Sequence, residues 1–194
     1  MAKRGPYGKG IERREQILEA ALKTIAERGF LATSVAELAE AVGLSQSGLL
    51  HYFGSKEELF VAVLLKRDQV DAAAHLNEAT PEALIRLIRH NTQVPGLIEL
   101  FTHMQAAAAD PNHPAHEYMR VHYELGTAAF AELIRGLQRA GEVPSTVDPD
   151  VMATSFMALT DGLQARWLID PTIDMEFYLR QCWTQFTGVE PDVG

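Results

Sequence analysis

A short stretch in the first third of the chain carries small or hydrogen-bonding residues, namely Gln46, Ser47, Gly48 and His51. Ser45 is well placed to cap a helix that we expect from about Gln46 to Tyr52. The inward side of this helix would be Leu49 with Leu50 or Phe53, so the four residues named first would face outward. Such residues can hydrogen-bond to base edges when a helix enters the major groove of DNA.

Lys56 stands in the first turn of the next expected helix, which Ser55 and Glu58 would start as a capping box. The N-terminus of a helix carries partial positive charge, so a lysine is a poor choice there on electrostatic grounds. A positive side chain beside free backbone N–H groups does suit a phosphate. We therefore interpret Lys56 as a candidate phosphate contact.

The residues before this stretch predict the helix that would position it. Apolar residues recur there at three- and four-residue spacing, at Val35, Leu38, Ala39 and Val42. Ser34 and Glu37 form a capping box at the start, and Gly43 follows the last periodic residue as a stop signal. Two short capped helices around a glycine turn outline a helix-turn-helix over residues 34–53. The same outline occurs in helical proteins that do not bind DNA, so the geometry alone leaves both interpretations open.

Residues 33–60, TSVAELAEAVGLSQSGLLHYFGSKEELF, resemble the N-terminal signature of the TetR family of bacterial transcriptional regulators nearly position for position. The similarity extends upstream to Arg14. The resemblance implies base-edge contacts from the four residues named first and contacts to the DNA backbone from Thr33, Tyr52 and Lys56. The chain departs from the family pattern at Leu50, where many members have a tyrosine whose hydroxyl could contact a phosphate.

The composition favours an all-α protein, and the helix signals along the chain predict about nine helices. Of the 194 residues, 47% are hydrophobic, and few segments alternate apolar and polar residues at period two. No apolar run approaches the roughly 18 residues of a membrane span, and no apolar core follows the basic N-terminus, so we expect a cytoplasmic protein without a membrane partner. The single cysteine, Cys182, excludes an internal disulfide and a cysteine-based zinc site.

The net charge of −9 is distributed unevenly along the chain. Residues 1–56 carry a net charge of +2, whereas residues 57–194 carry −11. Five of the first fourteen residues are basic, namely Lys3, Arg4, Lys9, Arg13 and Arg14. This arm could add phosphate or minor-groove contacts, or it could be a loose solubilising tail, since Gly5, Pro6, Gly8 and Gly10 interrupt it.

The helical pattern predicts two domains. A helix over residues 11–28 would close a three-helix head, and the helix from Lys56 to about Asn77 is too long for that head alone. We therefore expect a helix-turn-helix domain at 11–71 and a ligand-binding and dimerisation bundle at 72–190. The remaining helices are expected at about 81–92, 97–109, 115–140, 149–168 and 174–186.

The last two helices carry more apolar surface than the edge of one small bundle needs. Their large apolar residues include Phe156, Leu163, Trp167, Phe177 and Trp183. From the residues alone, a dimer interface and ordinary core packing are equally reasonable. The resemblance to TetR proteins favours a homodimer, because two subunits would match the half-sites of a palindromic operator.

The middle helices combine apolar residues with polar or polarisable ones, which is typical of a small-molecule pocket. The candidates are His90, His103, Met104, Tyr118, His122 and Arg166. Each of them could equally be an ordinary core or surface residue. TetR-like proteins typically bind a small molecule in this domain, and binding splays the two DNA-binding heads.

Other classes of function find little support in the sequence. His113 and His116 straddle a proline without a surrounding carboxylate motif, so no metal site is expected. No catalytic motif or cofactor signature appears, so we do not expect an enzyme. We expect a sequence-specific regulator, a repressor that a small-molecule effector releases from double-stranded operator DNA. The alternative is a helical interaction or small-molecule-binding protein without operator binding.

Overall fold

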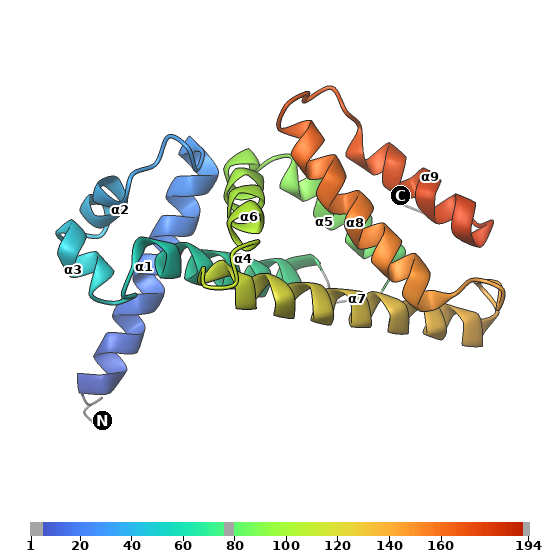
Figure 1. The fold of residues 1–194 in the computed structure, drawn as a ribbon, viewed down its shortest axis with the longest axis horizontal. Coiled ribbons are helices and arrows are strands. Elements are labelled where there is room, and N and C mark those ends of the chain that lie inside the picture. Colours follow the sequence, from blue (N-terminus) through green and yellow to red (C-terminus); the bar gives the residue numbers. More distant parts are fainter. Residues whose placement is uncertain (1–5, 76–79, 192–194) are drawn as a thin grey trace. The chain divides into compact units, whose positions relative to one another are not determined.

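The computed structural model describes residues 6–75 and 80–191, and in these residues it contains α-helices and no strand (Figure 1). The described helices are α1 (Pro6–Arg28), α2 (Val35–Ala41), α3 (Gln46–Leu50), α4 (Lys56–His75), α5 (Pro81–Asn91), α6 (Pro95–Ala107), α7 (Ala115–Ala140), α8 (Pro149–Trp167) and α9 (Met175–Thr187). The all-α prediction is confirmed. The expected end of α4 at Asn77 and the arm residues Lys3, Arg4 and Gly5 lie outside the described residues.

The chain divides into two compact units. The first unit consists of residues 1–70 and 94–115, and the second consists of residues 71–93 and 116–194. The expected division placed everything after residue 71 in one C-terminal domain. The structure instead groups α6 with the first unit, where it packs against α1. Helix α4 runs without interruption through the boundary at residues 70 and 71.

The first unit is built on the apolar faces of α1, α2, α3, α4 and α6. Its fully buried side chains include Ile17, Ile25, Leu38, Leu49, Leu59, Leu64, Ile98 and Leu100. Helix α1 begins five residues earlier than expected, because a proline with its fixed φ suits the first turn of a helix. The interpretation of Pro6, Gly8 and Gly10 as part of a loose tail is therefore wrong, since all three are helical.

The second unit packs α9 against both α5 and α8. Its core contains the ring of Phe130 from α7, which lies 4.8 Å from the ring of Phe156 and 6.2 Å from that of Trp183, measured between centroids. At the surface, the Arg89 guanidinium donates two hydrogen bonds of 2.7 Å to the Glu176 carboxylate and joins α5 to α9. This pair lowers the pKa of the Glu176 carboxyl below its ordinary value.

Three residues expected at a dimer interface lie inside this unit. Phe156 is 1% exposed, Leu163 is 5% exposed and Trp183 is 3% exposed. Their apolar surface is already covered by the same chain, so little of it is left for a second copy to cover. Trp167 is partly exposed and Phe177 is 51% exposed, so these two remain candidates.

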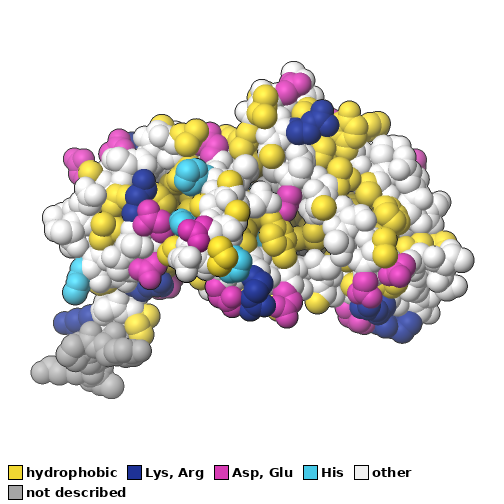
Figure 2. Space-filling view, in the orientation of Figure 1, with side chains coloured by type: hydrophobic (Ala, Val, Ile, Leu, Met, Phe, Trp, Pro, Cys, Tyr) yellow, Lys and Arg dark blue, Asp and Glu magenta, His cyan; other side chains and the backbone are white. Residues whose placement is uncertain are grey.

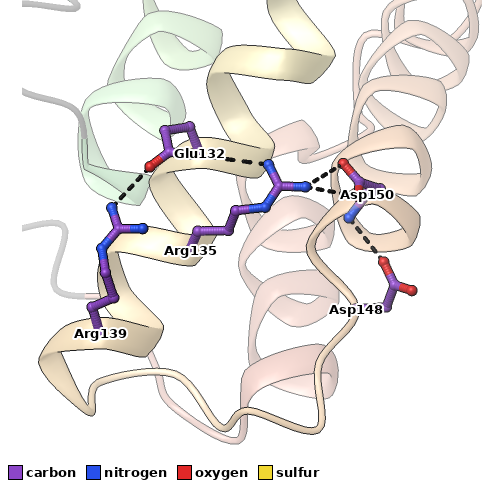
Figure 3. Close-up of polar contacts among 5 residues, drawn as sticks. All are labelled: Glu132, Arg135, Arg139, Asp148 and Asp150. Carbon is purple, nitrogen blue, oxygen red and sulfur yellow. Dashed lines mark hydrogen bonds and ion pairs between the residues drawn. The ribbon is translucent and has the colours of Figure 1, made fainter.

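One ion pair joins α7 to the first turn of α8, and another lies within α7 (Figure 3). Arg135 Nη2 donates to both carboxylate oxygens of Asp150, at 2.8 and 2.7 Å, while Arg139 Nη2 donates to Glu132 at 2.8 Å. Asp148 caps α8 by accepting the backbone N–H of Asp150.

None of the helices described here is both long enough and apolar enough to cross a membrane.

Candidate nucleic-acid interface

Helix α2 is fixed at its start by a complete capping box. The Ser34 hydroxyl accepts the Glu37 backbone N–H at 3.2 Å, and the Glu37 carboxylate accepts the Ser34 backbone N–H at 2.8 Å. These bonds to Ser34, with a smaller contribution from Arg28, lower the pKa of the Glu37 carboxyl. The capping box predicted from the sequence is confirmed.

The turn from α2 into α3 depends on Gly43, whose φ of 68° lies in the left-handed region that favours glycine. Ser45 then caps α3 by accepting the Gly48 backbone N–H at 3.0 Å, as its position predicts. Helix α3 ends at Leu50, two residues earlier than expected, and the chain continues as turns. The buried side chains of Leu49 and Phe53 hold this segment on the core of the first unit.

The side of α3 away from that core carries the residues expected to contact bases. Gln46, Ser47 and His51 are exposed, and Gly48 is partly exposed between them. The Ser47 hydroxyl lies 3.2 Å from the hydroxyl of Ser45, so the cap and the exposed side are continuous. The structure thus brings these four residues together on one accessible surface.

Two of the expected phosphate contacts flank this surface. Lys56 is exposed in the first turn of α4, and its ammonium lies 5.6 Å from the centre of the Phe60 ring. Ser55 caps the same helix by accepting the Glu58 backbone N–H at 3.0 Å. Tyr52 is partly exposed, with its ring 6.4 Å from that of His51. The side chains of Lys56 and Tyr52 are therefore accessible on the segment that follows α3.

The third expected phosphate contact, Thr33, is placed differently. It is 9% exposed, and its hydroxyl donates to the carbonyl oxygen of Gly29 at 2.7 Å. A hydroxyl has a single proton to donate, so this bond leaves none for a phosphate. In this structure Thr33 closes the α1–α2 turn, and its contact with DNA stays a prediction.

Arg13 and Arg14 of α1 contact the helix-turn-helix on the side that faces the core. The sequence did not reveal these contacts. Arg13 donates to the backbone carbonyl of Val42 at the end of α2. The guanidinium of Arg14 lies 4.8 Å from the centre of the Phe53 ring. Both arginines stand four residues before buried α1 residues, Ile17 and Leu18, and this spacing places them on the inward side of the helix.

The expected ligand-binding residues are divided between the two units. His103 and Met104 belong to the first unit, where Met104 is 2% exposed and the His103 ring lies 5.2 Å from that of Phe30. The other four lie in the second unit, namely His90, Tyr118, His122 and Arg166. Among these, the rings of Tyr118 and His122 are 5.7 Å apart on α7, whereas Arg166 is exposed near the end of α8.

His113, which with His116 has a spacing that could suit a metal, has a structural role. His113 Nδ1 accepts the backbone N–H of Ala115 at 3.1 Å and thereby caps α7. Across the described parts of the chain, no group of three or more histidine, cysteine, aspartate or glutamate side chains is arranged to hold a metal ion.

Comparison with known proteins places the chain among transcriptional regulators. The family model of bacterial regulatory proteins of the tetR family matches residues 17–63, and that of the C-terminal part of BetI-type transcriptional repressors matches residues 100–185. An HTH-type transcriptional repressor of Mycobacterium tuberculosis is 31% identical over 158 residues, which cover 79% of this chain and 81% of that relative.

Solved structures share the fold. A TetR-family transcriptional regulator from Rhodococcus sp. matches with a TM-score of 0.70 and 24% identity, over 91% of this chain and 98% of that one. The structure of AibR in complex with isovaleryl coenzyme A and operator DNA matches with a TM-score of 0.60 and 22% identity, over 93% and 100% of the two chains. Because the M. tuberculosis repressor matches over most of its length and the helix-turn-helix is complete, this chain belongs to the TetR family of bacterial transcriptional regulators.

Proposed function

We propose that the chain acts as a homodimeric repressor, with α3 in the major groove of a palindromic operator and a small-molecule effector that releases it. The observation that carries this proposal is the capped α3, which presents Gln46, Ser47 and His51 on its exposed side with Lys56 beside it. The Ser45 cap and the burial of Leu49 fix α3 in the absence of DNA, so DNA binding requires little further ordering of this helix.

The proposed dimer interface is the exposed side of α8, together with part of α9. Small exposed residues follow each other at three- and four-residue spacing along α8, namely Val151, Thr154, Ala158 and Gly162. Phe177 and Tyr178 on α9 are each about half exposed, at 51% and 49%. Figure 2 shows hydrophobic side chains at the surface over α8 and α9. Small residues let two helices approach closely, and the apolar ones would be covered by a second copy of the chain.

The proposed effector site lies in the second unit. Support comes from the pair Tyr118 and His122 on α7, and from Tyr123, whose hydroxyl donates to Asp161 on α8 at 2.7 Å. A related fold, AibR, has been solved with both isovaleryl coenzyme A and operator DNA. An effector can release DNA only if it binds more tightly to a conformation with low operator affinity.

Footprinting the full-length protein on the DNA upstream of its own gene tests the proposal. We expect a protected palindrome and an affinity that falls steeply between low and moderate salt. Replacing Lys56 with Ala should weaken binding to all duplexes similarly and reduce the salt slope by about one. Replacing Gln46 with Ala should change the preference at one base pair in each half-site, by about 1–3 kcal/mol.

A control variant and two contrary outcomes make the result decisive. Lys23→Ala removes an exposed α1 lysine paired with Glu27, and it should leave binding to the operator near the parent value. If the Lys56 and Gln46 variants both bind operator like the parent, α3 does not lie in the groove. If the parent protects no DNA at any salt concentration, the chain is a binding protein without an operator.

A further inference from the structure

The backbone of the α1–α2 turn is held by a side chain from a distant part of the sequence. The Glu99 carboxylate of α6 accepts the backbone N–H of Phe30 at 2.9 Å and that of Leu31 at 3.3 Å, both through Oε2. These N–H groups follow the end of α1 and precede the Ser34 cap of α2. A carboxylate that accepts two successive backbone N–H groups makes charge-assisted hydrogen bonds, which are stronger than neutral ones.

One turn earlier on α6, Gly96 brings the two helices into backbone contact. A Cβ atom at this position would overlap the carbonyl oxygen of Ile25 and lie 2.8 Å from the Cα atom of Gly29. Both are backbone atoms, which cannot move aside as the end of a flexible side chain could. Only glycine fits there, so α6 is set directly against the end of α1.

A third α6 residue, one turn after Glu99, completes the contact. The ring of His103 lies 5.2 Å from that of Phe30, and the Phe30 ring lies 5.0 Å from that of Phe60 on α4. Gly96, Glu99 and His103 are spaced by three and four residues, so they form one side of α6. This side of α6 therefore contacts the end of α1 and the α1–α2 turn, and the Phe30 ring continues the contact to α4.

The chain on both sides of α6 belongs to the second unit, at Gln93 before it and His116 after it. The helix-turn-helix is thus connected to the second unit through continuous α4 and through non-covalent contacts with α6. The hydrogen bonds from Glu99 are formed with backbone, immediately before α2. They can therefore hold the turn without using any residue that contacts DNA.

We infer that Glu99 is a positioning residue for operator recognition, which ties α6 to the α1–α2 turn and so holds α2 and α3 in their DNA-binding orientation. This inference rests on the proposed function. Leu31 is 80% exposed, so apolar packing of its side chain does not hold the turn. The carboxylate is the contact from outside the helix-turn-helix that reaches the N–H groups of both turn residues.

The test compares Glu99→Ala and Gly96→Ala in the full-length protein. The first variant removes the acceptor, and the second forces α6 away from α1. Each should speed hydrogen exchange of the backbone amides of residues 30–33 in the free protein. Each should also lower the ratio of operator affinity to affinity for a scrambled duplex about tenfold, the loss expected for charge-assisted hydrogen bonds. Glu99→Gln, which keeps a neutral acceptor, should fall between parent and Glu99→Ala.

Matched controls separate positioning from charge and from general stability. Glu27→Ala removes the same charge from the exposed last turn of α1, and Gly136→Ala adds a methyl group to α7 with only an ordinary contact to Arg139. Both should keep the parent affinity ratio and the parent exchange of residues 30–33. The ratio is informative because a purely structural loss of stability would lower the binding of operator and scrambled DNA alike.

Two results would overturn the inference. If exchange in the turn is unchanged in Glu99→Ala, the carboxylate does not hold the turn. If exchange rises while the affinity ratio stays at the parent value, the turn does not position α2 and α3 for the operator. If the parent protein itself prefers no duplex, the proposed function fails, and the exchange measurement still decides whether Glu99 holds the turn.

Discussion

At the scale of single residues, hydrogen bonds at the ends of α2, α3 and α4 hold the helices that present the exposed surface of α3. Ser34, Ser45 and Ser55 each cap a helix, and Arg13 binds the carbonyl at the end of α2. Orphan N–H and C=O groups at helix ends are satisfied in this way, so short helices keep their geometry. The exposed residues of α3 can then vary without disturbing the fold.

The Glu37 carboxyl gives a testable pH dependence at this scale. Its pKa is lowered in the folded protein, so its charge stabilises the fold above the ordinary carboxyl pKa, and this contribution is lost as the pH falls through the lowered pKa. Glu37→Gln keeps the shape of the cap and removes the charge. We expect this variant to be less stable than the parent at pH 7, and we expect the difference to shrink as the pH falls through the lowered pKa of Glu37.

Urea unfolding of parent and variant across this pH range measures the effect. Glu40→Gln makes the same charge change on the same helix, outside the capping box, and serves as the control. A stability difference for Glu37→Gln that does not change with pH would show that the carboxylate charge does not contribute through the cap.

At the scale of helices, two kinds of contact hold the α7–α8 loop, and their strengths should differ. The Gln138 side chain donates to the carbonyl oxygens of Pro144 and Val147, at 3.0 and 2.8 Å. The ion pair of Arg135 with Asp150 is exposed, with side-chain exposures of 39% and 72% (Figure 3). Exposed ion pairs contribute little, whereas a partly buried carbonyl left without a donor is costly.

We therefore predict that Gln138→Ala destabilises the protein by about 1–2 kcal/mol, and Arg135→Ala by less than about 1 kcal/mol. Unfolding in urea at low and high salt separates the two contributions. The effect of Arg135→Ala should shrink in high salt, while that of Gln138→Ala should persist. If Arg135→Ala destabilises the protein more than Gln138→Ala at both salt concentrations, the ion pair contributes more to holding the loop than the Gln138 hydrogen bonds do.

At the scale of the whole molecule, operator binding requires two copies of α3 held at a fixed spacing. A single subunit has one five-residue α3, which in the proposed function would contact one half-site. The proposed dimer therefore needs a pairing surface elsewhere in the chain, and the exposed side of α8 is the surface proposed for it.

Replacing Ala158 with Glu places a charge in the middle of that surface. An unpaired charge at an interface is costly to desolvate, so we expect a monomer by analytical ultracentrifugation and a loss of operator binding of at least about tenfold. Ala128→Glu makes the same substitution at an exposed position on α7 and should leave the dimer intact. If Ala158→Glu still sediments as a dimer, another surface pairs the subunits.

The sequence alone determined the helices and the helix-turn-helix, because the signals that define them are local. Ser34 with Glu37, Gly43, Ser45, and Asp148 with Pro149 mark helix ends through bonds within a few residues of the chain. Side-chain periodicity then identified the buried sides of α2 and α3, and with them the exposed residues of α3. In α7 it placed Leu125 on the inner side, whereas Leu125 is 65% exposed. The predicted bounds of α7 are the observed ones.

The tertiary structure alone decided which element covers each apolar face. Periodicity shows that Phe156 and Trp183 are on apolar faces, but only folding shows that Phe130 covers them and a second subunit does not. In the same way, only folding brings Glu99 to the α1–α2 turn, across nearly 70 positions of the chain. Contacts between residues far apart in sequence depend on how whole helices pack, and a local pattern does not record that packing.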